Sequence, residues 1–216
     1  MSGAATRFAW RDGEVSGAWH RPPSGERHAT LVLGHGAGGT MDTPQLIAIA
    51  EGLSSGGVAT ARFNFAYAEA GRRSPDKPDR LEACFWGVAK EAAEGAKRLF
   101  LGGRSLGGRI ASHIVADGFP AAGLVFVSYP LHPPGKPERL RDTHLQRIPV
   151  PMLFLSGSRD PFATPDLLDR TVNGLEAAIL HRLDGGDHSL KVPGRPAADV
   201  NREIVETILS WIRAKP

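Results

Sequence analysis

A five-residue turn between two apolar segments constrains the fold more than any other feature of the sequence. Residues 103–107 read Gly-Arg-Ser-Leu-Gly; a short apolar run precedes them, and apolar side chains with helical spacing follow as far as Val115. This context is typical of a strand, a sharp turn and a helix. The glycines two positions before and after Ser105 let strand and helix approach closely, so we expect the Ser105 hydroxyl to point out of the turn.

A serine in such a turn is suited to acyl transfer. Its hydroxyl lies at the carboxyl end of a strand, and the amides that follow it, beginning with Leu106 N–H, face an incoming oxyanion from a helix N-terminus. A purely structural interpretation, in which Ser105 only caps the helix, stays open on this motif alone. Dinucleotide and phosphate-loop motifs do not fit, because Arg104 stands where the first needs glycine and Gly108-Arg109 where the second needs Lys-Ser/Thr.

Length and composition predict one globular domain over residues 1–216, with residues 1–6 expected to be flexible. The chain has 216 residues, 41% of them hydrophobic and 23% charged, which is enough for a substantial core. Its formal net charge of +3 comes from basic and acidic residues spread along the chain. Because there is no basic run or nucleic-acid motif, we expect no nucleic-acid partner.

The single cysteine and the absence of long apolar stretches favour a cytoplasmic protein. Cys84 cannot form an internal disulfide, and it lies in a helix-like stretch where a buried apolar role is expected. No stretch approaches 18 apolar residues, and the first seven residues lack a signal-peptide pattern, so we expect no membrane partner. No His or Cys pair has metal-ligand spacing, so neither a metal nor a cofactor is expected.

Strand patterns alternate with helix patterns from residue 30 onward. A leading hairpin around Asp12-Gly13 is expected first, then strands that end in glycine-rich or polar loops. The alternation predicts an α/β fold with a mostly parallel central sheet of about eight strands and helices on both faces. Residues 136–149 allow about one helical turn plus loop, so we expect a minimal cap and an open site.

Three chemically useful side chains each follow a different predicted strand. Along the chain they are Ser105, Asp160 and His188, the order of nucleophile, acid and base in one class of catalytic triads. Parallel strands bring these ends together, so we expect His188 to take the serine proton and Asp160 to orient the ring. Taken singly, Asp160 could serve simply to start a turn, and His188 could lie in a solvated loop. Asp184 and Asp187 are weaker candidates than Asp160 for the acid of the triad.

The loop after the strand at 29–34 is the expected second donor of an oxyanion hole. It reads His-Gly-Ala-Gly-Gly at 35–39, and we assign the donor to Ala37 N–H, with Gly38 N–H as the alternative; a tight structural connection is the competing interpretation. His35 is expected to fix the loop through a backbone hydrogen bond. Apolar side chains past the strand ends are predicted to form an acyl pocket: Phe65, Tyr129, Leu131 and Phe162.

These motifs resemble the compact α/β-hydrolase-fold proteins grouped with dienelactone hydrolases. The chain looks most similar to the small branch that includes the hydrolase-like subunit of the non-specific-lethal acetyltransferase complex. The matching stretches lie within residues 30–212 and are Gly34–Gly39, Arg62–Phe65, Gly102–Arg109, Ser156–Pro161 and Gly186–Leu190. Dienelactone hydrolases usually carry cysteine where this chain has Ser105, so the resemblance implies a fold and a site rather than that substrate.

The resemblance implies a triad of Ser105, Asp160 and His188, with Ala37 and Leu106 as oxyanion donors. We therefore predict a cofactor-free serine hydrolase, a carboxylesterase or thioesterase that acts on a small-molecule acyl substrate. The alternative is a hydrolase-fold protein that mainly binds a partner, with little catalysis. The sequence makes no prediction of the oligomeric state.

Overall fold

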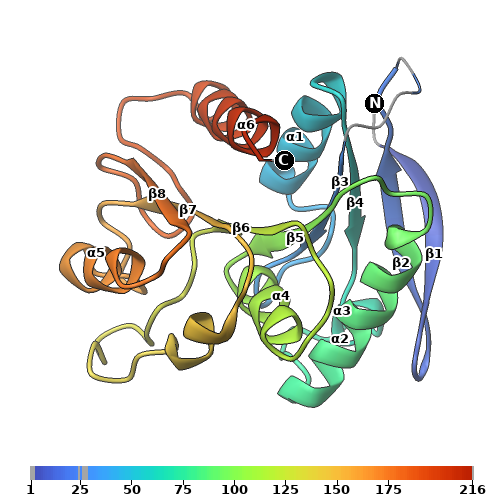
Figure 1. Cartoon of the computed structure of the whole chain (residues 1–216), viewed down its shortest axis with the longest axis horizontal. Helices are drawn as coiled ribbons and strands as arrows, with labels where there is room; N and C mark the ends of the chain where they lie inside the picture. The colour runs from blue at the N-terminus through green and yellow to red at the C-terminus, as the bar shows by residue number, and fades with distance from the viewer. Residues whose placement is uncertain (1–2, 24, 26–28, 216) are drawn as a thin grey trace.

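An eight-stranded sheet forms the centre of the computed structural model, which describes residues 3–23, 25 and 29–215 (Figure 1). The strand order is β1-β2-β4-β3-β5-β6-β7-β8, and β3 to β8 run parallel. The strand β2 pairs antiparallel with both of its neighbours, β1 and β4. The strands are β1 Ala4–Trp10, β2 Gly13–His20, β3 Ala29–Gly34, β4 Val58–Phe63, β5 Leu99–Arg104, β6 Gly123–Val127, β7 Met152–Gly157 and β8 Ala178–Leu183.

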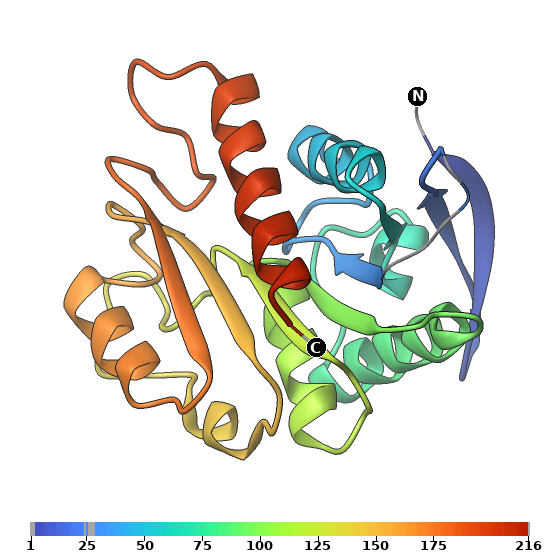
Figure 2. The ribbon, with the colours of Figure 1, turned by 45° about the horizontal axis from the view of Figure 1, so that its top comes forward.

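Helices cover both faces of this sheet, which confirms the predicted α/β fold class. On one face lie α1 (Pro44–Ser55) and α6 (Ala197–Arg213), which pack against each other (Figures 1 and 2). The opposite face carries α3 (Pro78–Ala93), α4 (Leu106–Ala116) and α5 (Pro165–Asn173). Two short elements, α2 (Ala66–Glu69) and the 3-10 helix η1 (Thr143–Arg147), lie in connections between strands.

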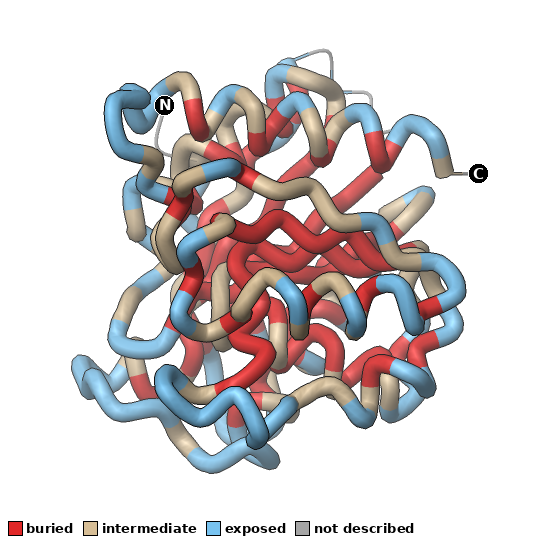
Figure 3. Tube along the Cα trace, turned by 90° about the vertical axis from the view of Figure 1, so that its left-hand side faces the viewer, coloured by how far each residue is buried: buried red, intermediate tan, exposed pale blue. Residues whose placement is uncertain are grey.

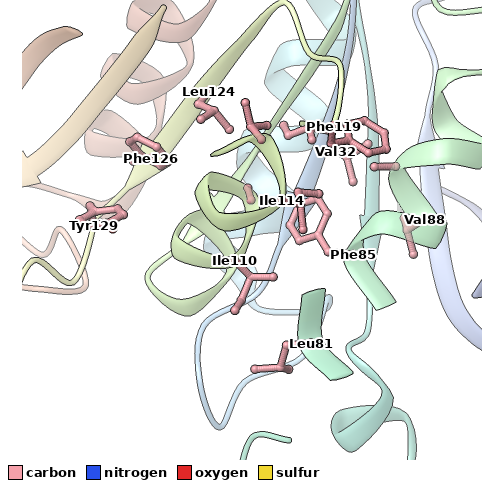
Figure 4. Packing of buried hydrophobic residues seen from close by; sticks show 14 of the residues in the cluster. Val32, Leu81, Phe85, Val88, Ile110, Ile114, Phe119, Leu124, Phe126 and Tyr129 are labelled. Carbon is pink, nitrogen blue, oxygen red and sulfur yellow. The ribbon is translucent and has the colours of Figure 1, made fainter. Parts of the chain in front are cut away.

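Burial follows from this layering, because a parallel sheet covered on both faces needs apolar side chains in both directions. Every residue of β3, β4, β6 and β7 is buried. Figure 3 shows the buried residues gathered along the centre of the molecule and the exposed ones on outer loops and helix faces. Side chains from α3 and α4 fill the space under one face, among them Phe85, Val88, Ile110 and Ile114 (Figure 4).

The predicted flexibility of residues 1–6 is wrong for residues 4–6. These residues belong to β1 and pair with β2 in register, from Ala4 opposite Trp19 to Thr6 opposite Gly17. Packing explains the ordering, since the ring of Phe8 is fully buried and occupies the space that a Cβ at Gly17 would need. The hairpin predicted around Asp12-Gly13 is confirmed, and residues 1 and 2 lie outside the described part of the chain.

The connection between β6 and β7 contains η1 as its one regular element, in line with the predicted minimal cap.

His144, on η1, lies against Ser112 of α4, with 2.8 Å between His144 Nε2 and Ser112 Oγ. Because the Ser112 hydroxyl donates its hydrogen to Arg109 O at 2.6 Å, His144 Nε2–H must be the donor in this contact. Tyr129 OH donates to Arg141 O. Burial, the largest cause, lowers the pKa of His144 to about 4.

The strand β3 and the turn at Ser105 touch through backbone alone. An ideal Cβ on Gly107 would lie 2.1 Å from Gly34 O, and one on Gly103 would lie 2.2 Å from the same oxygen. Gly103 also has a φ of 152°, a conformation that L side chains rarely adopt. Only glycine at both positions lets the turn pack directly on the end of β3. This contact fixes the position of Ser105 relative to the loop that follows β3.

We predict that Gly107→Ala destabilises the fold by about 3 kcal/mol or more, because no flexible side chain can yield to the new methyl group. Helix propensity alone would predict the opposite sign, since alanine is favoured over glycine in a helix by about 1 kcal/mol. Urea unfolding would measure the change in the free energy of unfolding. Gly174→Ala is the control, because its Cβ meets no atom closer than 3.4 Å; equal stability of the two variants would contradict the prediction.

We predict that stability falls as the pH is lowered from about 6.5 toward 4. An unfolded histidine takes up a proton near pH 6.5, whereas folded His144 does so near 4, so between these values unfolding binds a proton and becomes more favourable. Burial lowers the pKa of His20 and His35 as well, which acts in the same direction. His144→Gln should flatten the dependence of the urea midpoint on pH; parallel curves for variant and wild type would contradict this assignment.

Candidate active site

Ser105 occupies a strained turn between β5 and α4. Its φ of 49° and ψ of −110° lie outside the regions that non-glycine residues favour. The turn is held because Ser105 N–H donates to Val127 O at 2.9 Å and Gly103 and Gly107 press against β3. Strain of this kind persists only where the surroundings impose it, and it often accompanies function.

A continuous chain of hydrogen bonds joins three residues that are far apart in sequence. His188 Nε2 lies 2.9 Å from Ser105 Oγ, and His188 Nδ1 lies 2.9 Å and 2.8 Å from the two carboxylate oxygens of Asp160. The Asp160 side chain is fully buried, while that of His188 keeps 17% of its surface exposed. The structure thus brings together the three residues that the sequence singled out as nucleophile, acid and base.

Backbone contacts place the acid and the base. Phe162 N–H donates to Asp160 Oδ1 at 2.8 Å, which fixes the carboxylate at the end of β7. The loop of His188 follows β8 and packs onto β7 so closely that a Cβ on Gly157 would lie 2.1 Å from Gly186 O. A glycine at the end of β7 therefore brings the histidine loop within reach of Asp160.

The two rival carboxylates have other partners. Asp187 Oδ1 accepts the amide hydrogens of Ser189 at 2.7 Å and Lys191 at 3.0 Å, so it shapes the loop that carries His188. Asp184 accepts a hydrogen bond from Ser158 Oγ at 2.9 Å. The aspartate that reaches the imidazole is Asp160, as the order of strand ends suggests.

The loop after β3 is fixed by His35, in agreement with its predicted shaping role. Phe65 N–H must donate to His35 Nε2, at 3.1 Å, so His35 Nδ1–H is the donor to Gly36 O, at 2.8 Å. This pair of contacts requires a neutral ring, and burial lowers the pKa of His35 in the same sense. The loop is then closed by a turn in which Gly39 N–H donates to Gly36 O at 3.1 Å.

The two amides assigned to the oxyanion hole have no acceptor among the described residues. Ala37 is exposed on the turn just described, with Gly38 beside it at a φ of 71°. Leu106 opens helix α4, where the first N–H groups have no partner within the helix. Both amides are therefore available for a ligand near Ser105.

Arg62 and Asn64 hold the next part of this loop, a role that the sequence analysis missed. Arg62 is almost fully buried at the end of β4, where its guanidinium donates to Met41 O and to His20 Nε2 and lies 3.3 Å from Asp42. Asn64 Oδ1 accepts the Met41 amide hydrogen at 2.9 Å. The sequence did carry a signal for this role: two polar residues alternate with Phe63 and Phe65 at the end of an apolar strand.

Of the four predicted pocket residues, only Phe162 lies at the site. Its ring is 4.2 Å from that of His188 between centroids. By contrast, Phe65, Tyr129 and Leu131 are at most 1% exposed and belong to the hydrophobic core, so the structure corrects the prediction that they line an acyl pocket. Figure 4 shows Tyr129 in this core. The aromatic contacts of Phe65 and the Tyr129 hydrogen bond to Arg141 O direct these side chains inward.

A groove of about 760 Å³ begins beside the candidate oxyanion loop instead. Its lining includes Ala37 and Gly38, then Arg104 and Ser189, which are the sequence neighbours of Ser105 and His188. From there it extends to the first turn of α6, at Ala197 and nearby residues. The sequence analysis did not identify this groove, because three separate parts of the chain form its walls: residues 37–45, Arg104 and residues 189–201.

Two further properties concern only the part of the chain that the structure describes. There, no three His, Cys, Asp or Glu side chains gather in a way that could hold a metal ion. No helix within it combines the length and the apolar character needed to cross a membrane. Cys84 is buried as predicted, and burial raises the pKa of its thiol to about 12.

Known structures with the same architecture include several hydrolases. An α/β serine hydrolase without a lid from Xanthomonas campestris has a TM-score of 0.76 at 20% identity, covering 100% of this chain and 98% of that chain. Dienelactone hydrolase from Anabaena variabilis has a TM-score of 0.77 at 16% identity, covering 98% and 96%. Est1E from Butyrivibrio proteoclasticus with ferulic acid bound has a TM-score of 0.80 at 15% identity, covering 98% and 100%.

At such identities the likeness concerns the fold, and the sequence itself gives the family. The model of a family described as "Alpha/beta hydrolase domain" matches residues 27–213. This range includes the strained serine turn, the loop after β3 and the loops that carry Asp160 and His188. The protein therefore belongs to the alpha/beta hydrolase domain family.

Proposed function

We propose that this protein is a serine hydrolase that cleaves small carboxylic esters or thioesters through an acyl-enzyme. The observation that carries the proposal is the unbroken hydrogen-bond chain from Asp160 through His188 to Ser105 Oγ. Serine hydrolases among the structures of similar fold support it. Cytoplasmic localisation and membership of the dienelactone-hydrolase-like branch remain parts of the same proposal, resting on Cys84 and on the motifs of the sequence.

In the first half-reaction, Ser105 Oγ attacks the carbonyl carbon while His188 Nε2 accepts the hydroxyl proton. Asp160 stabilises the imidazolium that forms and holds its Nδ1–H, so Nε2 stays aimed at the serine. The carbonyl oxygen becomes an oxyanion between Ala37 N–H and Leu106 N–H. When the tetrahedral intermediate collapses, His188 passes its proton to the leaving alcohol or thiol, and the acyl group stays on Ser105.

The second half-reaction uses the same groups with water as the nucleophile. His188 Nε2 takes a proton from water, the resulting hydroxide adds to the acyl carbon, and the same two amides stabilise the oxyanion. Collapse releases the carboxylic acid and returns the proton to Ser105 Oγ. The exposed surface of His188 leaves water access to this step, and the β6–β7 connection contains only the short helix η1 as a regular element.

We predict that Ser105→Ala lowers kcat for 4-nitrophenyl butyrate by about 10,000-fold or more, because no nucleophile remains. A fluorophosphonate probe should label the wild type and not the variant, as read by intact mass. His113→Gln is the matched control, since this histidine lies on α4 in contact with Glu82 rather than at the strand ends. Circular dichroism and the urea midpoint establish that each variant is folded.

Two results would count against the proposal. Unchanged ester turnover in Ser105→Ala would show that another group is the nucleophile. Absence of labelling in folded wild-type protein would show that the serine is not activated, and the partner-binding alternative would then replace the catalytic one.

We predict that Ala37→Pro lowers kcat by about 100-fold or more, the typical cost of losing one oxyanion donor. Ala37 precedes Gly38, whose φ of 71° is typical of the third position of a type II turn, and proline fits the second position of that turn. The substitution should therefore remove the amide hydrogen while the turn persists. Ala37→Ser keeps the hydrogen and should stay close to wild type; equal losses in both variants would contradict the role of this amide.

A further inference from the structure

The groove beside the candidate oxyanion loop has a one-sided charge. Three cationic side chains, those of Arg104, Lys191 and Arg195, belong to its lining, and no aspartate or glutamate does. Much of the remaining wall is apolar, and its apolar members are Ala37, Pro44, Leu190, Val192, Ala197 and Val200. Such a lining suits a molecule with an apolar part and a negatively charged group.

Arg104 is the cation nearest to the chemistry, because it directly precedes Ser105. Its Nη2 donates to Ser189 Oγ at 3.0 Å and lies 3.5 Å from His188 O, so both contacts are neutral oxygens of the histidine loop. No carboxylate of the described residues lies within ion-pair distance of it; burial lowers the pKa of its guanidinium, and the more distant charges of Asp187 and Asp160 offset only part of that lowering. A partly desolvated guanidinium without a carboxylate partner favours an external anion.

Of the other two cationic side chains in the groove, Arg195 has a carboxylate partner and Lys191 has none among the described residues. Arg195 Nη1 lies 2.7 Å from Glu203, so its charge is already paired. Lys191 is exposed, and within the described residues its ammonium group has no ion pair, although its backbone N–H binds Asp187. Two unpaired positive charges, on Arg104 and Lys191, therefore share the groove.

We propose that this groove binds an anionic group of the ester or thioester substrate, a carboxylate or a phosphate, through Arg104 and Lys191. The inference rests on the proposed hydrolase function and names the substrate class for that site. Arg104 and Lys191 determine specificity, whereas the bond cleaved and the proton transfers are those already assigned to Ser105 and His188. The apolar wall accommodates the carbon chain between the reacting carbonyl and the charge.

The test compares substrates that differ in charge alone or nearly so. For a carboxylate on the acyl side, 4-nitrophenyl hydrogen glutarate is paired with its neutral methyl ester; for phosphate on the leaving side, S-butyryl-4′-phosphopantetheine is paired with S-butyrylpantetheine. We expect wild-type kcat/KM to be about tenfold higher for the anionic member of at least one pair. Which pair shows the preference identifies the source of the anion.

Variants then locate the effect. Lys191→Gln and Arg104→Gln should each reduce the ratio of anionic to neutral kcat/KM by about fivefold to tenfold, the loss expected for one charged contact. The ratio is the readout because Arg104 also contacts the histidine loop, so its loss can lower both rates together. Lys90→Gln, an exposed lysine on α3 across the sheet, is the control and should leave the ratio unchanged.

A binding measurement separates this inference from the proposed function. Ser105→Ala protein is titrated with monomethyl glutarate and with coenzyme A, and we expect saturable binding of one of them that weakens about tenfold on adding Lys191→Gln. Missing fluorophosphonate labelling alongside such binding would overturn the hydrolase and leave the anion site intact. Equal rates within both substrate pairs, or no binding of either probe, would overturn the anion site whatever the catalytic result.

Discussion

The site depends on one close approach between backbones, that of Gly34 at the end of β3 and the turn around Ser105. With no side chains at positions 34, 103 and 107, the turn rests on the oxygen of Gly34. The same residue begins the loop that carries Ala37, so one contact sets both the height of the nucleophile and the position of the facing amide. Wider spacing would separate the Ser105 hydroxyl from the Ala37 amide, and in the proposed mechanism the two act on the same carbonyl group.

Around this contact, polar side chains fix the loops by accepting hydrogen bonds from backbone N–H groups. His35 accepts the amide hydrogen of Phe65, Asn64 accepts that of Met41, and Asp187 accepts those of Ser189 and Lys191. Each loop is thus fixed by a polar group from its own segment or a neighbouring strand end. A site made of backbone amides needs this support, because a displaced amide cannot be replaced by a new side-chain rotamer.

The sequence predicted that Ser105, Asp160 and His188 lie together, because each follows a different strand and parallel strands end at a common edge. It failed where side-chain direction decides the outcome. Phe65 and Tyr129 also follow strands, yet their side chains point into the core. Phe65 packs against Phe85 of α3, and Tyr129 OH donates to Arg141 O in the β6–β7 connection. The first part of β1, residues 4–6, was missed because these residues are held in place by pairing with β2, which lies outside their own local sequence.

The connection between β6 and β7 leaves the sheet at the edge that carries Ser105 and runs through exposed residues 134–140 before η1. The entropic cost of lengthening a loop grows only with the logarithm of its length. Because these residues pair with no strand, a segment inserted among them would leave every strand pair of the sheet in place. Insertion at this one place could therefore change what reaches the site while the sheet and the hydrogen-bonded side chains of Ser105, His188 and Asp160 stay as they are.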